Sequence, residues 1–301
     1  MTLHKPNIGG NMQKYMRIQG REIAFKTKKP AGLFALCWRR IRDGIFSAED
    51  EALFREMDAW FRDNLPVPPF YDENEKKYLD KGEALPVTWF KTDCPAKFKQ
   101  KTDVIVSLLD KYQVPYDVVY SNYVGRIIYE DDFQIGTVEP EVQIRQIKKE
   151  ELPEVLELIH KSFATVAANL GFTKENCPGH TSFMPMEKLV NFFDWGFLMY
   201  GLFEDGKLTG YFSLARQEDG SYELNNLAVL PEKRHCGYGK QMIDFAKNKV
   251  VELGADTIKL GIIEDSWIIK NFYEWHGFKH IGTQKFEHLP FTCGYMMWHK
   301  T

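Results

Sequence analysis

The chain has 301 residues, of which 44% are hydrophobic and 27% are charged, and its formal net charge is −3 at pH 7. This composition fits a globular protein with room for roughly two domains of about 150 residues, and it gives no general attraction to nucleic acid or anionic membranes. Because the sequence has neither an apolar run of the roughly 20 residues that span a bilayer nor a signal-peptide core, we expect a cytoplasmic protein.

The five cysteines are scattered and form no CxxC pair. This pattern is typical of thiols in a reducing compartment, and it predicts neither a disulfide framework nor a zinc site. We therefore expect no metal.

The N-terminal half is expected to be a small α+β domain, residues 1–138, that begins with a ragged leader of about 15 residues. Residues 16–25 read as a strand, and residues 32–46 form an apolar segment whose type the pattern does not decide. Ser47 and Asp50 make an [ST]xx[DE] start for a helix over residues 48–64. Its core-facing stripe repeats at spacings of three to four and comprises Leu53, Met57, Trp60, Phe61 and Leu65.

A second helix is predicted over residues 95–112. Two β-rich runs follow within residues 116–131, on either side of Asn122 and Gly125, and together they predict a hairpin. The next segment, 131–141, is acidic, contains Gly136 and Pro140, and has no helical period. We place the domain boundary in this segment, after residue 138.

The C-terminal half, residues 139–301, alternates more regularly between strand and helix patterns. We expect strands over 142–147, 197–204, 208–216, 221–230 and 257–263 and two more at the end, and helices over 149–163, 185–193, from 237 onward and over 266–276. This order predicts an α/β fold with a mixed, mostly antiparallel sheet flanked by helices.

The strand over residues 221–230 contains a change of phase. Tyr222 and Leu224 are apolar on one face, whereas Leu227 and Val229 fall on the opposite phase, with residues 225–226 between them. A slip of one residue predicts a β-bulge, which bends a strand and frees backbone groups for a ligand.

The next stretch, VLPEKRHCGYGK, has the chemistry of an anion site. Glycines at the beginning of a helix leave backbone N–H groups and the positive end of the helix dipole accessible, which favours phosphate. A P-loop is excluded because Arg234 and Gln241 replace its first glycine and its hydroxyl residue, and a dinucleotide fingerprint is excluded by Met242. The pattern that remains is RxxGxG, with Gly237 and Gly239.

This pattern resembles the acetyl-CoA loop of the GNAT N-acetyltransferases. The later segment SWIIKNFYEWHGF also resembles the family, because Phe272, Tyr273 and the following GF pair match its pattern, while Ser266 and Ile269 replace the usual Asn and Ala. The resemblance covers residues 142–301. The N-terminal half resembles a small bacterial domain of unknown activity.

The resemblance implies a bacterial N-acetyltransferase that moves the acetyl group of acetyl-CoA to a primary amine of a small-molecule or amino-acid-like acceptor, by direct attack in a ternary complex. It implies that Tyr273 protonates the CoA sulfur. Glu223 is the candidate base, with water an equal alternative and Glu264 a second carboxylate to consider. The residues expected to bind the co-substrate are Leu227, Ala228, Val229, Arg234, His235, Cys236, Gly237, Tyr238, Gly239, Lys240, Asn271 and Tyr273.

Other interpretations stay open at this stage. Tyr273 fits a core aromatic, and Arg234 and Lys240 fit solvated cations, whereas a Cys177–His180 nucleophile pair is disfavoured for want of a third orienting group. The protein as a whole could be a non-catalytic CoA sensor with the N-terminal domain as effector, or an acetyltransferase acting on protein or RNA, although the acidic balance disfavours nucleic acid. The N-terminal domain is expected to be a lid, a dimerisation surface or an acceptor-recruiting module, so a homodimer also stays open.

Overall fold

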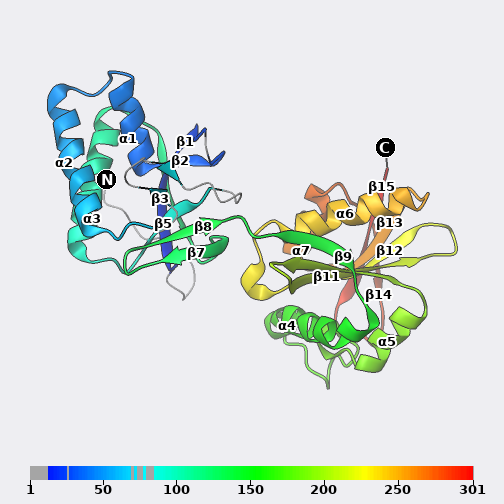
Figure 1. The fold of residues 1–301 in the computed structure, drawn as a ribbon. Coiled ribbons are helices and arrows are strands. Elements are labelled where there is room, and N and C mark those ends of the chain that lie inside the picture. Colours follow the sequence, from blue (N-terminus) through cyan, green and yellow to red (C-terminus); the bar gives the residue numbers. More distant parts are fainter. Residues whose placement is uncertain (1–12, 26, 69–70, 73–76, 79–84, 301) are drawn as a thin grey trace. The chain divides into compact units, whose positions relative to one another are not determined.

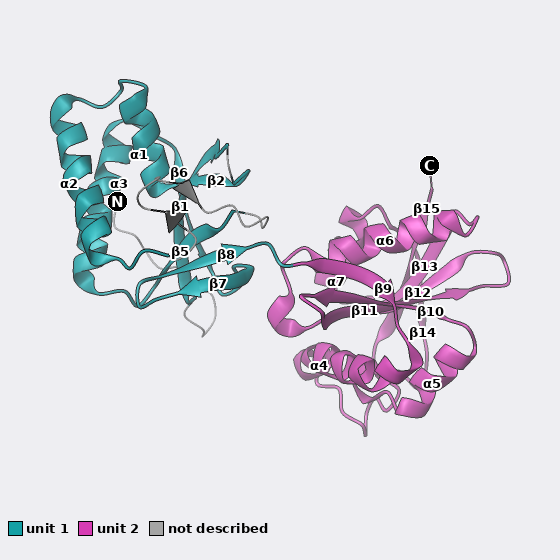
Figure 2. Cartoon of the chain, viewed as in Figure 1, with its two compact units in different colours: residues 1–140 teal, residues 141–301 magenta. Residues whose placement is uncertain are grey.

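The protein is described here by a computed structural model that covers residues 13–25, 27–68, 71–72, 77–78 and 85–300 (Figure 1). Most of the expected leader lies outside the described residues. The chain divides into two compact units, unit 1 (Met1–Pro140) and unit 2 (Glu141–Thr301), which are coloured separately in Figure 2. No helix among the described residues has both the length and the apolar character needed to cross a membrane.

Unit 1 is an α+β fold. Its described helices are α1 (Leu33–Arg42), α2 (Ala48–Asn64) and α3 (Ala96–Lys111). Its main sheet has the order β2-β1-β5-β8-β7, with β6 paired to β1, and the strands are β1 (Tyr15–Ile23), β2 (Pro30–Gly32), β5 (Val87–Lys91), β6 (Tyr116–Ser121), β7 (Arg126–Glu130) and β8 (Gln134–Val138). The short strands β3 (Tyr71–Asp72) and β4 (Lys77–Tyr78) pair with each other.

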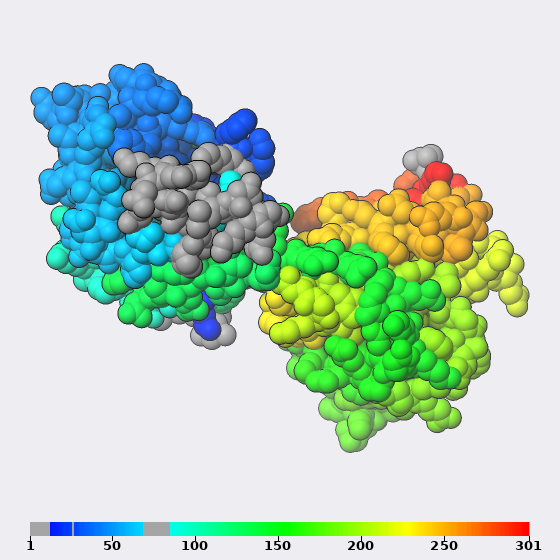
Figure 3. Space-filling view, viewed as in Figure 1, coloured from blue at the N-terminus to red at the C-terminus, as the bar shows by residue number. Residues whose placement is uncertain are grey.

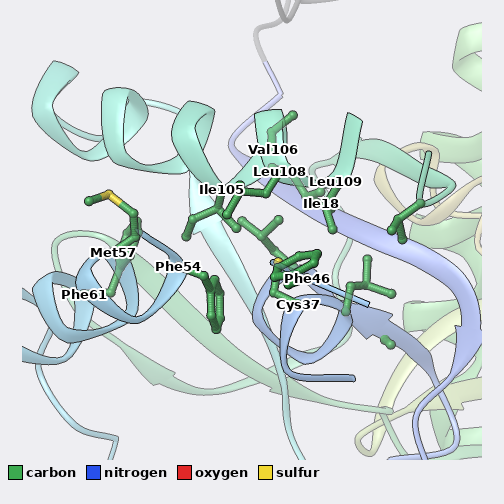
Figure 4. Packing of buried hydrophobic residues seen from close by; sticks show 14 of the residues in the cluster. Ile18, Cys37, Phe46, Phe54, Met57, Phe61, Ile105, Val106, Leu108 and Leu109 are labelled. Atoms are coloured by element: carbon green, nitrogen blue, oxygen red, sulfur yellow. The ribbon is translucent and has the colours of Figure 1, made fainter. Parts of the chain in front are cut away.

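The core of unit 1 forms where its helices pack together, as Figure 4 shows for Phe54, Met57 and Phe61 of α2 beside residues of α3. Helix α2 has the predicted bounds because Ser47 caps it: the Ser47 Oγ accepts from the Asp50 N–H at 3.2 Å. The buried stripe includes Phe54, whereas Leu53 is 36% exposed, so the prediction for Leu53 was wrong.

One further prediction for unit 1 needs correction. The predicted hairpin over residues 116–131 does not form, because β6 pairs with β1 and β7 pairs with β8. The tight turn lies one segment later, where the Asp131 carboxylate accepts from the backbone N–H groups of Phe133 and Gln134. The acidic segment 131–141 contains β8, a fully buried strand that ends at Val138, the residue after which we place the domain boundary.

Unit 2 contains a seven-stranded sheet in the order β14-β15-β13-β12-β11-β10-β9. The strands are β9 (Val142–Gln146), β10 (Leu198–Glu204), β11 (Lys207–Arg216), β12 (Tyr222–Val229), β13 (Thr257–Ile263), β14 (Lys279–Lys285) and β15 (Thr292–His299). The described helices are α4 (Leu152–Leu170), α5 (Met186–Asp194), α6 (Tyr238–Glu252) and α7 (Trp267–Trp275), with short 3-10 turns at Lys149–Glu151, Thr181–Phe183 and Pro231–Lys233. The β12–β13 pair is parallel and the other pairs are antiparallel, which confirms the predicted mixed sheet.

The helices of unit 2 cover both faces of this sheet. Figures 1 and 3 show α6, in yellow to orange, on one face and α4, in green, on the other. Along β11, Tyr211 packs in the core cluster beneath α4, whereas Phe212 lies 6.2 Å from Phe245 of α6, measured between ring centroids. This alternation buries both faces of β11 and makes the middle of the sheet a rigid support for the strand next to it.

Candidate functional site

The predicted bulge in β12 is confirmed. Ala228 lies opposite Tyr211 and Asn225 lies opposite Ser213, so β12 uses one more residue than β11 over the same interval. Asn226 occupies the bulge with φ +54°. Asparagine is among the few residues with a side chain that adopt this left-handed region at modest cost.

The bulge changes what β12 presents beyond it. Ala228 packs in the cluster beneath α4, whereas Leu224, four residues earlier, pairs with Leu214 of β11 and belongs to the opposite face. On its other side β12 pairs with β13 through Tyr222 and Glu223, and no later pair occurs among the described residues. The two parallel strands therefore diverge, and backbone groups over residues 226–229 could bind an extended ligand.

The connection from β12 to α6 has the backbone conformation of an anion cradle. His235 has φ +63° and Gly237 has φ +82°, and Gly237 is the N-cap of α6, which has no side-chain cap. Left-handed residues of this kind turn successive backbone N–H groups to one side, and the helix dipole adds partial positive charge there. The first turn of α6 could therefore hold a phosphate group.

Two cations anchor this connection to the rest of unit 2. Lys233 forms an ion pair with the buried Glu204 at 2.7 Å. The Arg234 Nη2 donates to the Ser162 carbonyl of α4 at 2.7 Å, and the Ser162 hydroxyl in turn donates to the Val229 carbonyl at 3.1 Å. Burial lowers the pKa of Arg234, which is the sign expected for a desolvated cation.

The other predicted cation, Lys240, lies on the surface. Its ammonium group pairs with Asp244 at 2.5 Å, one helical turn along α6, and its side chain is 65% exposed. Arg234 therefore lies at the base of the cradle, whereas Lys240 lies on the exposed side of α6.

The two glycines of the motif serve different physical purposes. Gly237 needs its positive φ, and a Cβ added there would meet no atom within 4 Å. Gly239 has an ordinary helical conformation, but an added Cβ would lie 3.0 Å from the Cζ atom of Phe272. Gly239 thus allows α7 to pack against the beginning of α6.

This contact brings Tyr273 close to the cradle. Tyr273 follows Phe272 in α7, is 9% exposed, and packs against Phe278 with ring centroids 5.4 Å apart. Its hydroxyl makes no hydrogen bond to another described residue. Burial raises the pKa of Tyr273 above its ordinary value, so the hydroxyl is protonated at neutral pH and is a weaker acid than that of an ordinary tyrosine. Asn271 lies on the same helix and is half-buried.

The two candidate carboxylates lie in different surroundings. Glu223 is half-buried at the last position where β12 still pairs with β13, and its Oε2 accepts from Gln217 at 3.4 Å. Glu264 is held by Lys270 at 2.6 Å and by His280 at 2.9 Å. Lys270 first, and then His280, lowers the pKa of Glu264, which makes it a weaker base than an ordinary glutamate.

The cysteines near the site are not activated as nucleophiles. Burial raises the pKa of Cys236 to about 11 and also raises the pKa of Cys177. Among the described residues the His180 ring forms no hydrogen bond with the Cys177 thiol, and its Nδ1 interacts with Ser182 at 2.8 Å. Within the described residues no group of three His, Cys, Asp or Glu side chains could hold a metal ion.

Two residues of this region were missed by the sequence reasoning. Asn226 adopts the left-handed conformation in the bulge. The sequence held a signal for this, because an asparagine, which tolerates a positive φ, lies at the change of phase. Ser162 carried no such signal, because its partners lie 67 and 72 residues away along the chain.

The match to a protein-family model falls within unit 2. Residues 196–280 match the family model described as "Acetyltransferase (GNAT) domain". A protein of Lactobacillus delbrueckii subsp. lactis, named "Uncharacterized N-acetyltransferase in pepI 3'region", is 29% identical over 150 residues, which is 45% of this chain and 83% of that protein. The uncharacterized N-acetyltransferase YvbK of Bacillus subtilis (strain 168) is 31% identical over 80 residues, 27% of this chain and 52% of that protein.

A solved structure shows a similar arrangement. The PaiA N-acetyltransferase of Thermoplasma acidophilum, in complex with coenzyme A, aligns with a TM-score of 0.44 and 20% sequence identity, covering 53% of this chain and 99% of that one.

Proposed function

We propose that the C-terminal unit is an acetyl-CoA-dependent acetyltransferase of the GNAT family and that it acetylates a primary amine of a small-molecule or amino-acid-like acceptor. The observation that carries this proposal is the adjacency of the bulged β12 and the cradle at the N-terminus of α6. A ligand such as CoA, with an extended arm joined to phosphates, needs two adjacent sites: a free strand edge for the arm and an anion site for the phosphates.

The fit of acetyl-CoA rests on three features of the described residues. The cradle has two left-handed residues and an uncapped helix N-terminus for the pyrophosphate. The guanidinium of Arg234 forms no ion pair with a described residue, so a bound anion would compensate its charge. The backbone of Leu227, Ala228 and Val229 is available to the pantetheine arm where β12 and β13 diverge.

The chemistry proposed is a direct transfer. The neutral amine nitrogen attacks the thioester carbon, the C–S bond breaks, and the acetyl group leaves sulfur for nitrogen. Tyr273 would give its proton to the departing thiolate, and its position on α7 supports this role, because it follows Phe272, the residue that lies against Gly239 at the beginning of α6. The proton lost by the amine would pass to Glu223 or to water.

The test is a thiol-release assay with acetyl-CoA against pooled amines, amino acids and polyamines. Tyr273→Phe removes the proton donor, so we expect kcat to fall by about 10²-fold with the affinity for CoA retained. Tyr200→Phe is the matched control, because Tyr200 is also buried, has a pKa raised by burial, and packs against Phe212 and Phe245 away from α7. It should keep the wild-type rate.

The outcomes separate the proposal from its alternatives. Absence of CoA binding in calorimetry would contradict the proposed function altogether. Binding of CoA without turnover of any amine would favour a macromolecular acceptor or a sensing role. In a sensing role, Tyr273→Phe would leave the protein's activity unchanged.

A further inference from the structure

Ser162 connects three elements of the candidate site and belongs to none of the motifs in the sequence. It is 3% exposed and lies in the second half of α4. Its hydroxyl donates to the Val229 carbonyl at the end of β12, and its own carbonyl accepts from Arg234 at the base of the cradle. We propose that Ser162 is a positioning residue. It fixes the end of β12, which would align the thioester, relative to the loop before α6, which would hold the phosphates.

The direction of the Ser162 hydroxyl supports this role. A serine inside a helix commonly donates back to a carbonyl of its own helix. Thr165, one turn along the same helix, does this: its hydroxyl donates to the Ser162 carbonyl at 2.9 Å. Ser162 instead reaches across to β12, so its hydroxyl bonds to the sheet rather than to α4.

Arg234 extends the connection toward the ligand. One of its nitrogens is fixed by the Ser162 carbonyl, and the guanidinium is a fork with five N–H donors. The remaining donors form no hydrogen bond with a described residue, so a bound anion could accept from them. A bound anion and the Ser162 carbonyl would together restrain the Arg234 guanidinium. Because the Ser162 hydroxyl also bonds to the Val229 carbonyl, the same residue would restrain the end of β12.

This inference rests on the proposed function, since it names what aligns the acetyl group during transfer. The predicted consequence is a split between binding and chemistry. Loss of the Ser162 hydroxyl leaves the cradle and Arg234 in place but releases the end of β12. Ser162→Ala should therefore lower kcat about 5- to 10-fold, the effect of one lost hydrogen bond, and change the Kd for CoA by less than about 2-fold.

The matched control is Thr165→Ala. This change removes a hydroxyl of the same helix that donates to the Ser162 carbonyl and forms no bond with β12. It should change neither kcat nor the Kd for CoA. A merely structural role for Ser162 would lower the unfolding midpoint and leave the kcat of the folded protein at the wild-type value, and that result would overturn the inference.

A second measurement does not depend on the acceptor. In the wild-type protein, CoA should slow amide hydrogen exchange over both 226–230 and 235–240, whereas in Ser162→Ala it should slow exchange over 235–240 alone. An unchanged pattern in Ser162→Ala would contradict the proposal even if the wild-type protein acetylates no tested amine. If the wild-type protein fails to bind CoA, the proposed function fails. The connection from Ser162 to Val229 is then tested without ligand: faster amide exchange over 226–230 in Ser162→Ala, but not in Thr165→Ala, would support it, and equal exchange in both variants would contradict it.

Discussion

Gly239→Ala offers a sharp test of how α6 and α7 meet. Gly239 is the second residue of α6 and has a helical backbone, so alanine should ordinarily be the better residue there. The added Cβ, however, would lie 3.0 Å from Cζ and 3.4 Å from Cε2 of Phe272. The sign of the effect depends on whether Phe272 can move.

The magnitudes favour destabilisation. Alanine gains up to about 1 kcal/mol over glycine in a helix, and less in the first turn, whereas forcing a methyl group into a packed site costs about 1–3 kcal/mol. Phe272 is itself restrained, because its ring packs against His276 at 4.6 Å and Tyr273 at 5.3 Å between centroids. We therefore expect Gly239→Ala to lose about 1 kcal/mol of unfolding free energy.

Urea unfolding and the acetyl-transfer assay measure the two consequences. A displaced Phe272 should carry Tyr273 with it, so kcat should fall along with stability. Phe272→Leu shortens the opposing side chain, so the double variant should lose less than the sum of the two single losses. Gly179→Ala, where an added Cβ meets nothing within 4 Å, is the control. A Gly239→Ala protein that is more stable than the wild type and fully active would refute the reasoning.

Three further predictions address other parts of unit 2. Gly237→Ala should cost about 1 kcal/mol of unfolding free energy because of the φ of +82° alone, and Gly237→Asn should cost less. Equal losses in urea unfolding would mean that side-chain contacts, and not the backbone conformation, set the cost. Tyr211→Phe removes a buried hydroxyl that has no hydrogen-bond partner among the described residues, so the free energy of unfolding should stay level or rise. A loss above about 1 kcal/mol would show a bond to Ser213. The Arg145 guanidinium lowers the pKa of Glu151 to about 2, below the ordinary 4.5, so its contribution to stability is present above pH 4.5 and is lost as the pH falls toward 2. Glu151→Gln should flatten the acid limb of a stability-versus-pH curve in that window, and an unchanged limb would contradict the assignment.

The elements that the sequence predicted well are those whose determinants are local. Helix α2 begins after its cap at Ser47 and ends at the predicted residue. Both its cap and its apolar spacing depend on residues that lie close together in the sequence. The bulge in β12 could be read from the phase of four apolar residues, since the side chains of a strand alternate with period two. The beginning of α6 at the two glycines likewise agrees with the sequence pattern, whereas phosphate binding there stays a prediction.

Pairing between strands was not determined by local pattern. The runs that became β6 and β7 looked like partners because they are neighbours in sequence, yet β6 pairs with β1, about 100 residues earlier in the chain. The acidic segment 131–141 was assigned no strand, although it contains the buried strand β8. The charged residues around this short strand obscured its apolar pattern.

The connections that assemble the candidate site were decided by tertiary structure alone. The sequence named Arg234, Gly239 and Tyr273, but it did not indicate that Arg234 would donate to Ser162 or that Gly239 would lie against Phe272. Local sequence determines which backbone conformations and which faces an element offers, because those depend on residues a few positions apart. Which faces then meet depends on the simultaneous packing of α4, α6 and α7 on one sheet, and only the folded chain settles it.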